Sequence, residues 1–285
     1  MQLQPLAARV LFVLLLGPAT ARSQAASVSD TAGYHLAWAD EFSQDGWPDP
    51  RHWTYERGFV RNQEAQWYQA DNAVVKDGML VIEARREVKP NPTFERGSTD
   101  WRRSRENVQL TSSSVTTRGL RSFKYGRFEM RARIDIRPGM WPAFWTLGDT
   151  GRWPANGEID IMEYYRGNVL ANVAWADSAG KAIWDDVRKP VTELGDASWS
   201  SRFHVWRMDW DEREIRLSVD GVVLNTIDLA TTINGDSEKR NPLQQPHYIL
   251  LNLAVGGMNG GDHSATSFPA RFEVDYVRVY QRAAQ

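Results

Sequence analysis

Alternation of polar and apolar residues with a period of two is the feature that most restricts how this sequence can fold. The segment 127–136 alternates over its whole length, and 273–280 does the same near the end of the chain. Successive side chains of a β-strand point to opposite faces, so each segment is predicted to be a strand with one face against a core. The nearly continuous apolar run 248–255 is typical of a strand covered on both sides. Amphipathic helical periodicity is weak throughout, and the chain is therefore expected to be all-β.

Two Asp-Gly pairs predict hairpins. Asp77-Gly78 lies between two β-favouring runs, and Asp220-Gly221 lies between two more; Asp-Gly is a strong signal for a two-residue hairpin turn. Many strands with turn signals, and no internal repeat or linker, favour a two-sheet antiparallel β-sandwich. In such a sandwich one face of each inner strand covers the core. The outward face of a curved sheet is then free to form a groove for an extended chain.

Three carboxylates are concentrated in 157–163, which reads Gly-Glu-Ile-Asp-Ile-Met-Glu. In a strand, Glu158 and Asp160 share one face and the two isoleucines share the core face. Strict alternation would turn Glu163 toward the core, which is a poor place for a charge. One extra residue, a β-bulge at 161–162, would return it to the side of the other two acids. The sequence therefore predicts a row of three acids on the outward face.

Aromatic residues surround these acids. Alternating acids most often mark a solvated strand face, and most of the 13 tryptophans belong in the core. Here, however, Trp141, Trp145 and Trp153 lie close to the acids in sequence. Sugar rings have an apolar C–H face that packs on aromatic rings, while their hydroxyls bond to polar groups. The combination of tryptophans and carboxylates therefore favours a carbohydrate site.

The amino-terminal segment is predicted to be a removable secretory signal. Arg9 precedes an apolar run at 10–17, and small residues at 18–21 suit cleavage between about residues 21 and 26. The apolar run is too short to span a bilayer. We therefore expect residues 1–21 to be a signal peptide and 27–285 to form a single domain, secreted or periplasmic. The chain contains no cysteine, so no disulfide framework is expected.

The charge balance argues against a nucleic-acid partner. The formal net charge is −2, whereas nucleic-acid binders normally carry a strong basic excess.

The locally basic segment 85–105 is broken up by prolines and glycine, which favours a solvated loop; recognition of an anionic substituent on a substrate is the alternative. The five histidines are scattered, without zinc-binding spacing. We expect a monomer, with no membrane partner after signal cleavage.

These motifs occur in the same order as in the family 16 glycoside hydrolases, and the chain resembles that family, in particular the bacterial laminarinase-like β-glucanases. The resemblance covers nearly the whole chain after the signal. It implies a curved jelly-roll sandwich of the concanavalin A type. The similar blocks, in sequence order, are 38–42, 62–68, 80–85, 125–129, 139–145, 157–164, 251–257 and 274–280.

The resemblance implies roles for the three acids. Glu158 would be the nucleophile of a retaining hydrolase, Glu163 the general acid/base, and Asp160 the residue that assists the nucleophile. Retaining chemistry independently requires two carboxyl groups about 5–5.5 Å apart, one ionised and one protonated. Acids at such distances titrate together, and one pKa rises. No cofactor is expected for this chemistry.

Further residues gain expected roles from the resemblance. Trp141 and Trp145 would stack on glucosyl rings on the non-reducing side of the cleaved bond. Glu64 and Arg85 would bond to sugar hydroxyls in the same arm; for Arg85 an exposed charge, or a pair with Glu64, remains an alternative. A structural calcium ion is also implied, bound by one carboxylate and by backbone carbonyls. Its ligands in this chain would be Asp275, Glu41 and Gly78.

The sequence departs from the laminarinase pattern on the leaving-group side. Ala174 stands where laminarinases carry a histidine, and the next residue, Trp175, is a candidate sugar contact instead. The glycine-rich segment 256–261 lacks the usual Asn-Trp-Pro-Gly turn, and the insertion 180–190 brings Trp184, which is expected to form another wall. These changes do not affect the prediction that the protein is a hydrolase. They weaken the prediction that its substrate is a β-1,3-glucan.

The expected activity is therefore endo-acting hydrolysis of a β-linked polysaccharide, chiefly β-1,3- or mixed β-1,3/1,4-glucan, by double displacement. A galactan or sulfated-galactan hydrolase on the same scaffold is an alternative. A non-catalytic glucan-binding protein is another, although the three intact acids argue against it. Transglycosylation also remains open, because another sugar can intercept a covalent glycosyl-enzyme.

Overall fold

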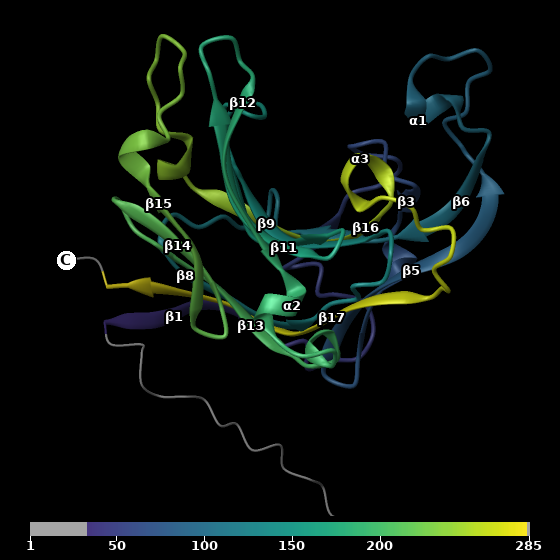
Figure 1. Cartoon of the computed structure of the whole chain (residues 1–285), viewed down its shortest axis with the longest axis horizontal. Coiled ribbons are helices and arrows are strands. Elements are labelled where there is room, and N and C mark those ends of the chain that lie inside the picture. The colour runs from purple at the N-terminus through teal and green to yellow at the C-terminus, as the bar shows by residue number, and fades with distance from the viewer. Residues whose placement is uncertain (1–32, 284–285) are drawn as a thin grey trace, which may run out of the picture. The chain divides into compact units, whose positions relative to one another are not determined.

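Residues 33–283, the part of the chain that this computed structural model describes, fold into two β-sheets packed face to face (Figure 1). The predicted signal peptide, residues 1–21, lies outside the described residues. Residues 33–283 belong to one compact unit. The predicted all-β sandwich is confirmed, and the pairing is antiparallel except between β3 (Gln66–Tyr68) and β6 (Asn107–Ser112), which run parallel.

The larger sheet has ten strands. Eight of them form one path in the order β15-β14-β13-β8-β17-β5-β6-β3, while β1 pairs with β17 and β4 pairs with β5. Besides β3 and β6, the strands of this sheet are β1 (Tyr34–Asp40), β4 (Ala73–Lys76), β5 (Met79–Pro90), β8 (Gly126–Arg133), β13 (His204–Trp210), β14 (Glu214–Val219), β15 (Val222–Asp228) and β17 (Ala270–Arg282).

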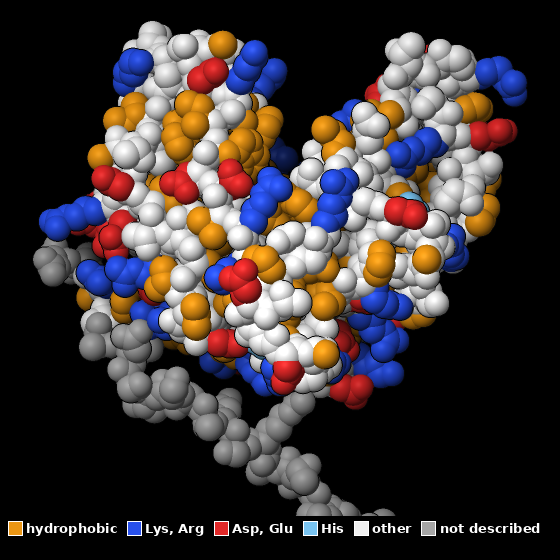
Figure 2. Space-filling view, viewed as in Figure 1, with side chains coloured by type: hydrophobic (Ala, Val, Ile, Leu, Met, Phe, Trp, Pro, Cys, Tyr) orange, Lys and Arg blue, Asp and Glu red, His pale blue; other side chains and the backbone are white. Residues whose placement is uncertain are grey.

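The seven-stranded sheet has the order β12-β11-β10-β9-β16-β7-β2. In Figure 1, β12 rises on one side of this sheet and β6 with α1 on the other, and Figure 2 shows a hollow between these two sides. Its strands are β2 (Thr54–Tyr55), β7 (Ser114–Thr116), β9 (Met140–Gly148), β10 (Glu158–Tyr165), β11 (Asn168–Ala176), β12 (Ala182–Pro190) and β16 (His247–Val255).

Helical structure is limited to single turns within the described residues, as the weak helical periodicity predicts. The α-helical turns are α1 (Trp101–Ser104), α2 (Val191–Leu194) and α3 (Gly257–Gly260). The 3₁₀ turns are Ala70–Asn72, Trp199–Ser201, Leu229–Thr231 and Pro242–Gln244. No helix between residues 33 and 283 is long and apolar enough to cross a bilayer.

Both predicted hairpins are confirmed. Asp77 and Gly78 join β4 to β5 with φ of 54° and 73°, and Asp220 and Gly221 join β14 to β15 with φ of 49° and 81°. Positive φ at both central residues is the backbone of a type I′ turn, and Asp-Gly tolerates it well. Local turn chemistry thus sets these two connections.

The core lies between the sheets and follows the alternation in the sequence. In β8 the apolar residues Phe128, Met130 and Ala132 are completely buried, whereas the residues between Phe128 and Ala132 are partly accessible. Every residue of β16 is buried, as its continuous apolar run predicts. The core supports the seven-stranded sheet from below and leaves its other face to line the groove.

Candidate active site

The acidic strand β10 carries the predicted bulge. Its pairing with β11 shifts register between Asp160 and Glu163, and its pairing with β9 shifts between Asp160 and Met162. Ile161 and Met162 are both completely buried in the core. Because two consecutive residues point inward, Glu163 returns to the face that carries Glu158 and Asp160. The bulge places all three acids on the groove side, as predicted.

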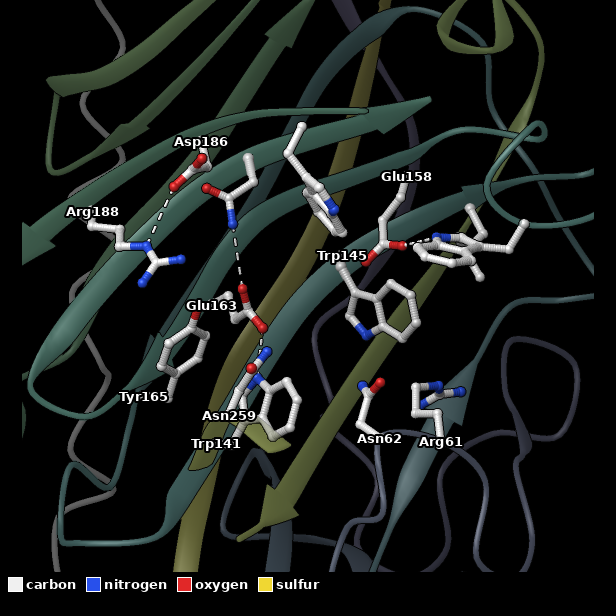
Figure 3. A pocket seen from close by; sticks show the side chains of 14 residues that line it. Arg61, Asn62, Trp141, Trp145, Glu158, Glu163, Tyr165, Asp186, Arg188 and Asn259 are labelled. Carbon is white, nitrogen blue, oxygen red and sulfur yellow. Dashed lines mark hydrogen bonds and ion pairs between the residues drawn. The ribbon is translucent and has the colours of Figure 1, made fainter. Parts of the chain in front are cut away.

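A pocket of about 550 Å³ opens on this face of the seven-stranded sheet (Figures 2 and 3). Figure 3 shows Glu158 and Glu163 in its middle, with Asp186 and Arg188 toward one end and Arg61 and Asn62 toward the other. The residues that line it are Arg61, Asn62, Trp141, Trp145, Leu147, Trp153, Glu158, Glu163, Tyr165, Asn172, Trp184, Asp186, Arg188 and Asn259.

The carboxyl group of Glu163 has the properties of a general acid. The indole Nε1 of Trp141 donates to its Oε1 at 2.6 Å, and the Asn172 side chain donates to its Oε2 at 3.4 Å. Burial, partly opposed by the Trp141 hydrogen bond, raises the pKa of Glu163 to about 7. At neutral pH the group is therefore divided between its acid and base forms, which suits proton transfer in both directions.

Glu158 and Asp160 form a linked pair of carboxyl groups. Asp160 is only 4% exposed, and burial together with the charges of Glu158 and Glu163 raises its pKa well above the usual range. Burial also raises the pKa of Glu158, but three groups oppose this: the Trp153 N–H, a hydrogen bond with Asp160 and the charge of Arg61. The proton therefore belongs on Asp160, which can donate to an ionised Glu158.

A polar cluster supports the aromatic floor on the other side of the acids. Trp145 donates from its Nε1 to Asn252 at 2.7 Å, and the guanidinium of Arg61 lies 5.0 Å from its ring centre. Glu64 is buried in a small recess of about 40 Å³ that it shares with the three acids. Gln66 donates to Glu64 at 2.7 Å, and burial raises the pKa of Glu64 to about 7. The structure thus brings Trp141, Trp145 and Glu64 to the site.

The basic segment 85–105 does more than form a solvated loop. Arg105 donates to the backbone carbonyls of Glu64 and Gln63 at 2.6 and 3.0 Å. Arg102 donates to the carbonyl of Val60 at 2.9 Å. These contacts hold the loop that presents Arg61, Asn62 and Glu64, so part of the basic segment positions the site.

Two sequence-based assignments are wrong in this structure. Arg85 donates to Glu83 at 2.6 Å and to the carbonyl of Asp71 at 3.1 Å, and it does not line the pocket. Trp175 packs in the core between the sheets. It follows Ala174, whose cross-strand partner is Glu158, so strand alternation turns Trp175 to the opposite face.

The carboxylate expected to bind calcium is paired with an arginine. Asp275 accepts a hydrogen bond from Arg131 at 2.6 Å, and Glu41 accepts two from Arg278 at 2.7 and 2.8 Å. The one carboxylate expected to bind calcium, Asp275, is therefore paired with arginine, and among residues 33–283 no three or more His, Cys, Asp or Glu side chains are grouped so that they could hold a metal ion. The expected set, Asp275 with the backbone carbonyls of Glu41 and Gly78, therefore offers calcium no carboxylate that is free of arginine.

Several pocket residues were not assigned from the sequence. They are Arg61, Asn62, Leu147, Tyr165, Asn172, Asp186, Arg188 and Asn259. Trp153 and Trp184, which the sequence placed near the acids and in a further wall, also line the pocket. One signal was available: Trp184, Asp186 and Arg188 occupy alternate positions, which places them on one face of any strand that contains them. That this face belongs to the groove follows only from the pairing of β12 with β11.

Comparison with known proteins agrees with this geometry. The model of the family "Glycosyl hydrolases family 16" matches residues 61–278. The chain is 35% identical to a beta-glucanase of Rhodothermus marinus over 267 residues, covering 87% of this chain and 85% of that protein.

Two solved structures are also similar. The laminarinase catalytic domain of Thermotoga maritima MSB8 superposes with a TM-score of 0.72 at 32% identity, covering 88% of this chain and 99% of that one. A structure from a study of endo-acting O-glycanases, with which members of the human gut microbiota initiate mucin breakdown, gives a TM-score of 0.79 at 33% identity and covers 88% and 91%.

Proposed function

The chain belongs to glycosyl hydrolase family 16, and from this membership we propose that it is a secreted, retaining enzyme that cleaves β-1,3- or mixed β-1,3/1,4-linked glucan within the chain. It is an O-glycosyl hydrolase of the endo-β-1,3(4)-glucanase type. One observation supports the mechanism above all: Glu158 and Glu163 line the same pocket, where burial raises the pKa of Glu163 to about 7, while Trp153, Asp160 and Arg61 oppose the rise in the pKa of Glu158.

These two settings suit a double-displacement reaction. Protonated Glu163 donates its proton to the glycosidic oxygen while ionised Glu158 attacks the anomeric carbon, so the leaving sugar departs and a covalent glycosyl-enzyme forms. Glu163, now a carboxylate, removes a proton from water as that water attacks the same carbon and releases Glu158. Asp160 keeps its own proton on the Glu158 side, which orients the nucleophile and limits repulsion among the three acids.

The floor of the groove provides binding for the sugar chain. Trp141 and Trp145 come from the same face of β9 and line the pocket beside the acids. Their indoles offer apolar surface for sugar C–H faces, and their N–H groups are engaged by Glu163 and Asn252. Arg61, Asn62 and Glu64 add polar groups on the same arm.

A second candidate substrate is a mucin-type O-glycan. The structure from the O-glycanase study superposes on this chain better than the laminarinase domain does. Ala174, which stands at the laminarinase histidine position, also removes a polar contact on the leaving-group side. A galactan substrate would use the same acids and the same aromatic floor.

A substrate panel distinguishes these candidates. The purified protein is incubated with laminarin, lichenan, agarose, porphyran, carrageenan and mucin, and the released oligosaccharides are identified by mass spectrometry. Internal cleavage of laminarin or lichenan supports the proposal. Release from mucin or from the galactans alone would replace the glucan assignment and leave the mechanism in place.

The mechanism itself is tested by Glu158→Gln, which removes the nucleophile but keeps the shape of the side chain. We expect hydrolysis of the preferred polysaccharide to fall by more than about 10³-fold, measured as release of reducing ends. Glu238→Gln, on an exposed glutamate paired with Arg240 outside the pocket, is the matched control. Unchanged activity of the Glu158 variant would exclude the proposed mechanism.

A further inference from the structure

Strand β12 extends the groove face beyond the acids. Through the registers of β10 with β11 and of β11 with β12, each acid is aligned with one β12 side chain two strands away. The aligned rows are Glu158–Ala174–Trp184, Asp160–Asn172–Asp186 and Glu163–Leu170–Arg188. Directly paired residues of neighbouring strands point to the same face. The three β12 side chains therefore face the groove, and all three line the pocket.

Two tryptophans at this end of the pocket are unusually accessible. Trp184 is 42% exposed and Trp153 is 52% exposed, and their ring centres lie 6.5 Å apart at an angle of 49°. Trp153 also donates from its indole N–H to Glu158. Large apolar side chains left open to solvent within a pocket are typical of a binding surface. These two indoles form such a surface next to the nucleophile.

Ala174 allows this arrangement. It lies in the row between Glu158 and Trp184, and its methyl group is completely buried. A longer side chain here would project from the same sheet face between Glu158 and Trp184. Ala174, which stands where laminarinases carry histidine, is thus paired with the aromatic residue Trp184 on the next strand.

Asp186 and Arg188 add polar groups to the same face. The Nε of Arg188 lies 3.3 Å from Asp186 Oδ2, and both side chains are about half exposed. The guanidinium of Arg188 lies 5.8 Å from the ring centre of Tyr165, another pocket residue. One acceptor and several free donor hydrogens are therefore available to sugar hydroxyls beside Glu163 (Figure 3).

The side of the bond that this surface serves follows from the strand order. Trp141 and Trp145 lie on β9, on one side of the acidic strand, whereas β12 lies on the other side beyond β11. If Trp141 and Trp145 on β9 hold the non-reducing part of the chain, as expected from the sequence, β12 faces the departing sugar. We propose that Trp184, Asp186 and Arg188, with Trp153, form a leaving-group subsite for a neutral pyranose, in which Trp184 determines specificity by packing on the sugar's C–H face.

This proposal rests on the proposed function and is tested with two substrates whose leaving groups differ. Laminaripentaose places glucosyl units on the leaving side, whereas β-laminaribiosyl fluoride loses only fluoride there. We expect Trp184→Ala to lower kcat/KM for laminaripentaose by about tenfold and to change kcat/KM for the fluoride by less than about twofold. Trp184→Phe should retain most of the activity on laminaripentaose.

Trp47→Ala is the matched control, because Trp47 is 61% exposed but does not line the pocket; it should leave both rates unchanged. Equal losses on the two substrates would give Trp184 a structural role and overturn the subsite, and so would the absence of any loss. A wild-type enzyme that cleaves neither substrate would instead contradict the glucan assignment on which the subsite depends.

Discussion

At the scale of single residues, the protonation of Glu163 depends on its close neighbours. Burial raises its pKa to about 7, and the hydrogen bond from Trp141 is the largest influence in the opposite direction. Trp145, four residues along the same strand, donates to the neutral Asn252 instead. Two similar indoles therefore have different electrostatic effects on the catalytic acid.

This difference predicts a shift in the pH profile. In the wild type, kcat/KM should fall above pH 7, because Glu163 must be protonated in the free enzyme to act as an acid. Trp141→Phe removes a donor that stabilises the ionised carboxylate, so the pKa rises and the alkaline limb should move to higher pH by about half a unit or more. The measurement is kcat/KM between pH 4 and 9.

Trp145→Phe is the control for this profile. It should weaken substrate binding but leave the position of the alkaline limb unchanged, because its partner carries no charge. An alkaline limb that stays in place in the Trp141 variant would show that another group limits the reaction at high pH.

At the scale of one element, the entry into β10 depends on Gly157. Its φ is +77°, and a Cβ there would lie 2.9 Å from a Leu243 methyl group and 3.0 Å from Pro242 Cβ. The next residue is Glu158, so the backbone turn at Gly157 sets where the strand begins and where the nucleophile points. Only glycine meets both requirements without displacing the 3₁₀ turn Pro242–Gln244.

Two alanine substitutions separate conformational strain from contact. Gly180 has a nearly identical φ of +75° but no atom within 4 Å of an added Cβ. Gly180→Ala should lower the free energy of unfolding by about 1 kcal/mol through strain alone. Gly157→Ala should lower it by about 2–4 kcal/mol because of the added contacts, and should also reduce kcat. Denaturant unfolding compares the two variants. Equal losses in the free energy of unfolding would show that Leu243 and Pro242 can move away from the added methyl group without cost.

At the scale of the whole molecule, the ten-stranded sheet carries ion pairs where a calcium site was expected from the sequence. Arg131 pairs with Asp275 on the neighbouring strand, and Arg278 pairs with Glu41. These pairs neutralise the carboxylates without a metal. The sandwich is then stabilised mainly by the apolar core between its two sheets.

Metal removal tests this conclusion. We expect the Tm of the purified protein to change by less than about 1 °C on treatment with EDTA, and to be unaffected by added calcium, because a ligand stabilises a protein only if the folded state binds it. Differential scanning calorimetry in matched buffers is the measurement. A Tm that falls in EDTA and is restored by calcium would reinstate the metal site.

The sequence by itself determined the features that depend on neighbouring residues. Alternation assigned the faces of β8 and β10, and the continuous apolar run of β16 marked a strand covered on both sides. The Asp-Gly pairs fixed two hairpins, and the need to keep Glu163 out of the core required a bulge. These are consequences of strand geometry and turn chemistry, which act over a few residues.

The tertiary structure decided which strands pair and what each side chain meets. Trp175 enters the core because Ala174 pairs with Glu158, and Arg85 is withdrawn from the site by Glu83. Trp184 and Arg188 reach the groove only because β12 pairs with β11. Strand pairing joins residues far apart in the chain, and burial sets the pKa values of the acids. Neither can be obtained from the local pattern of residues.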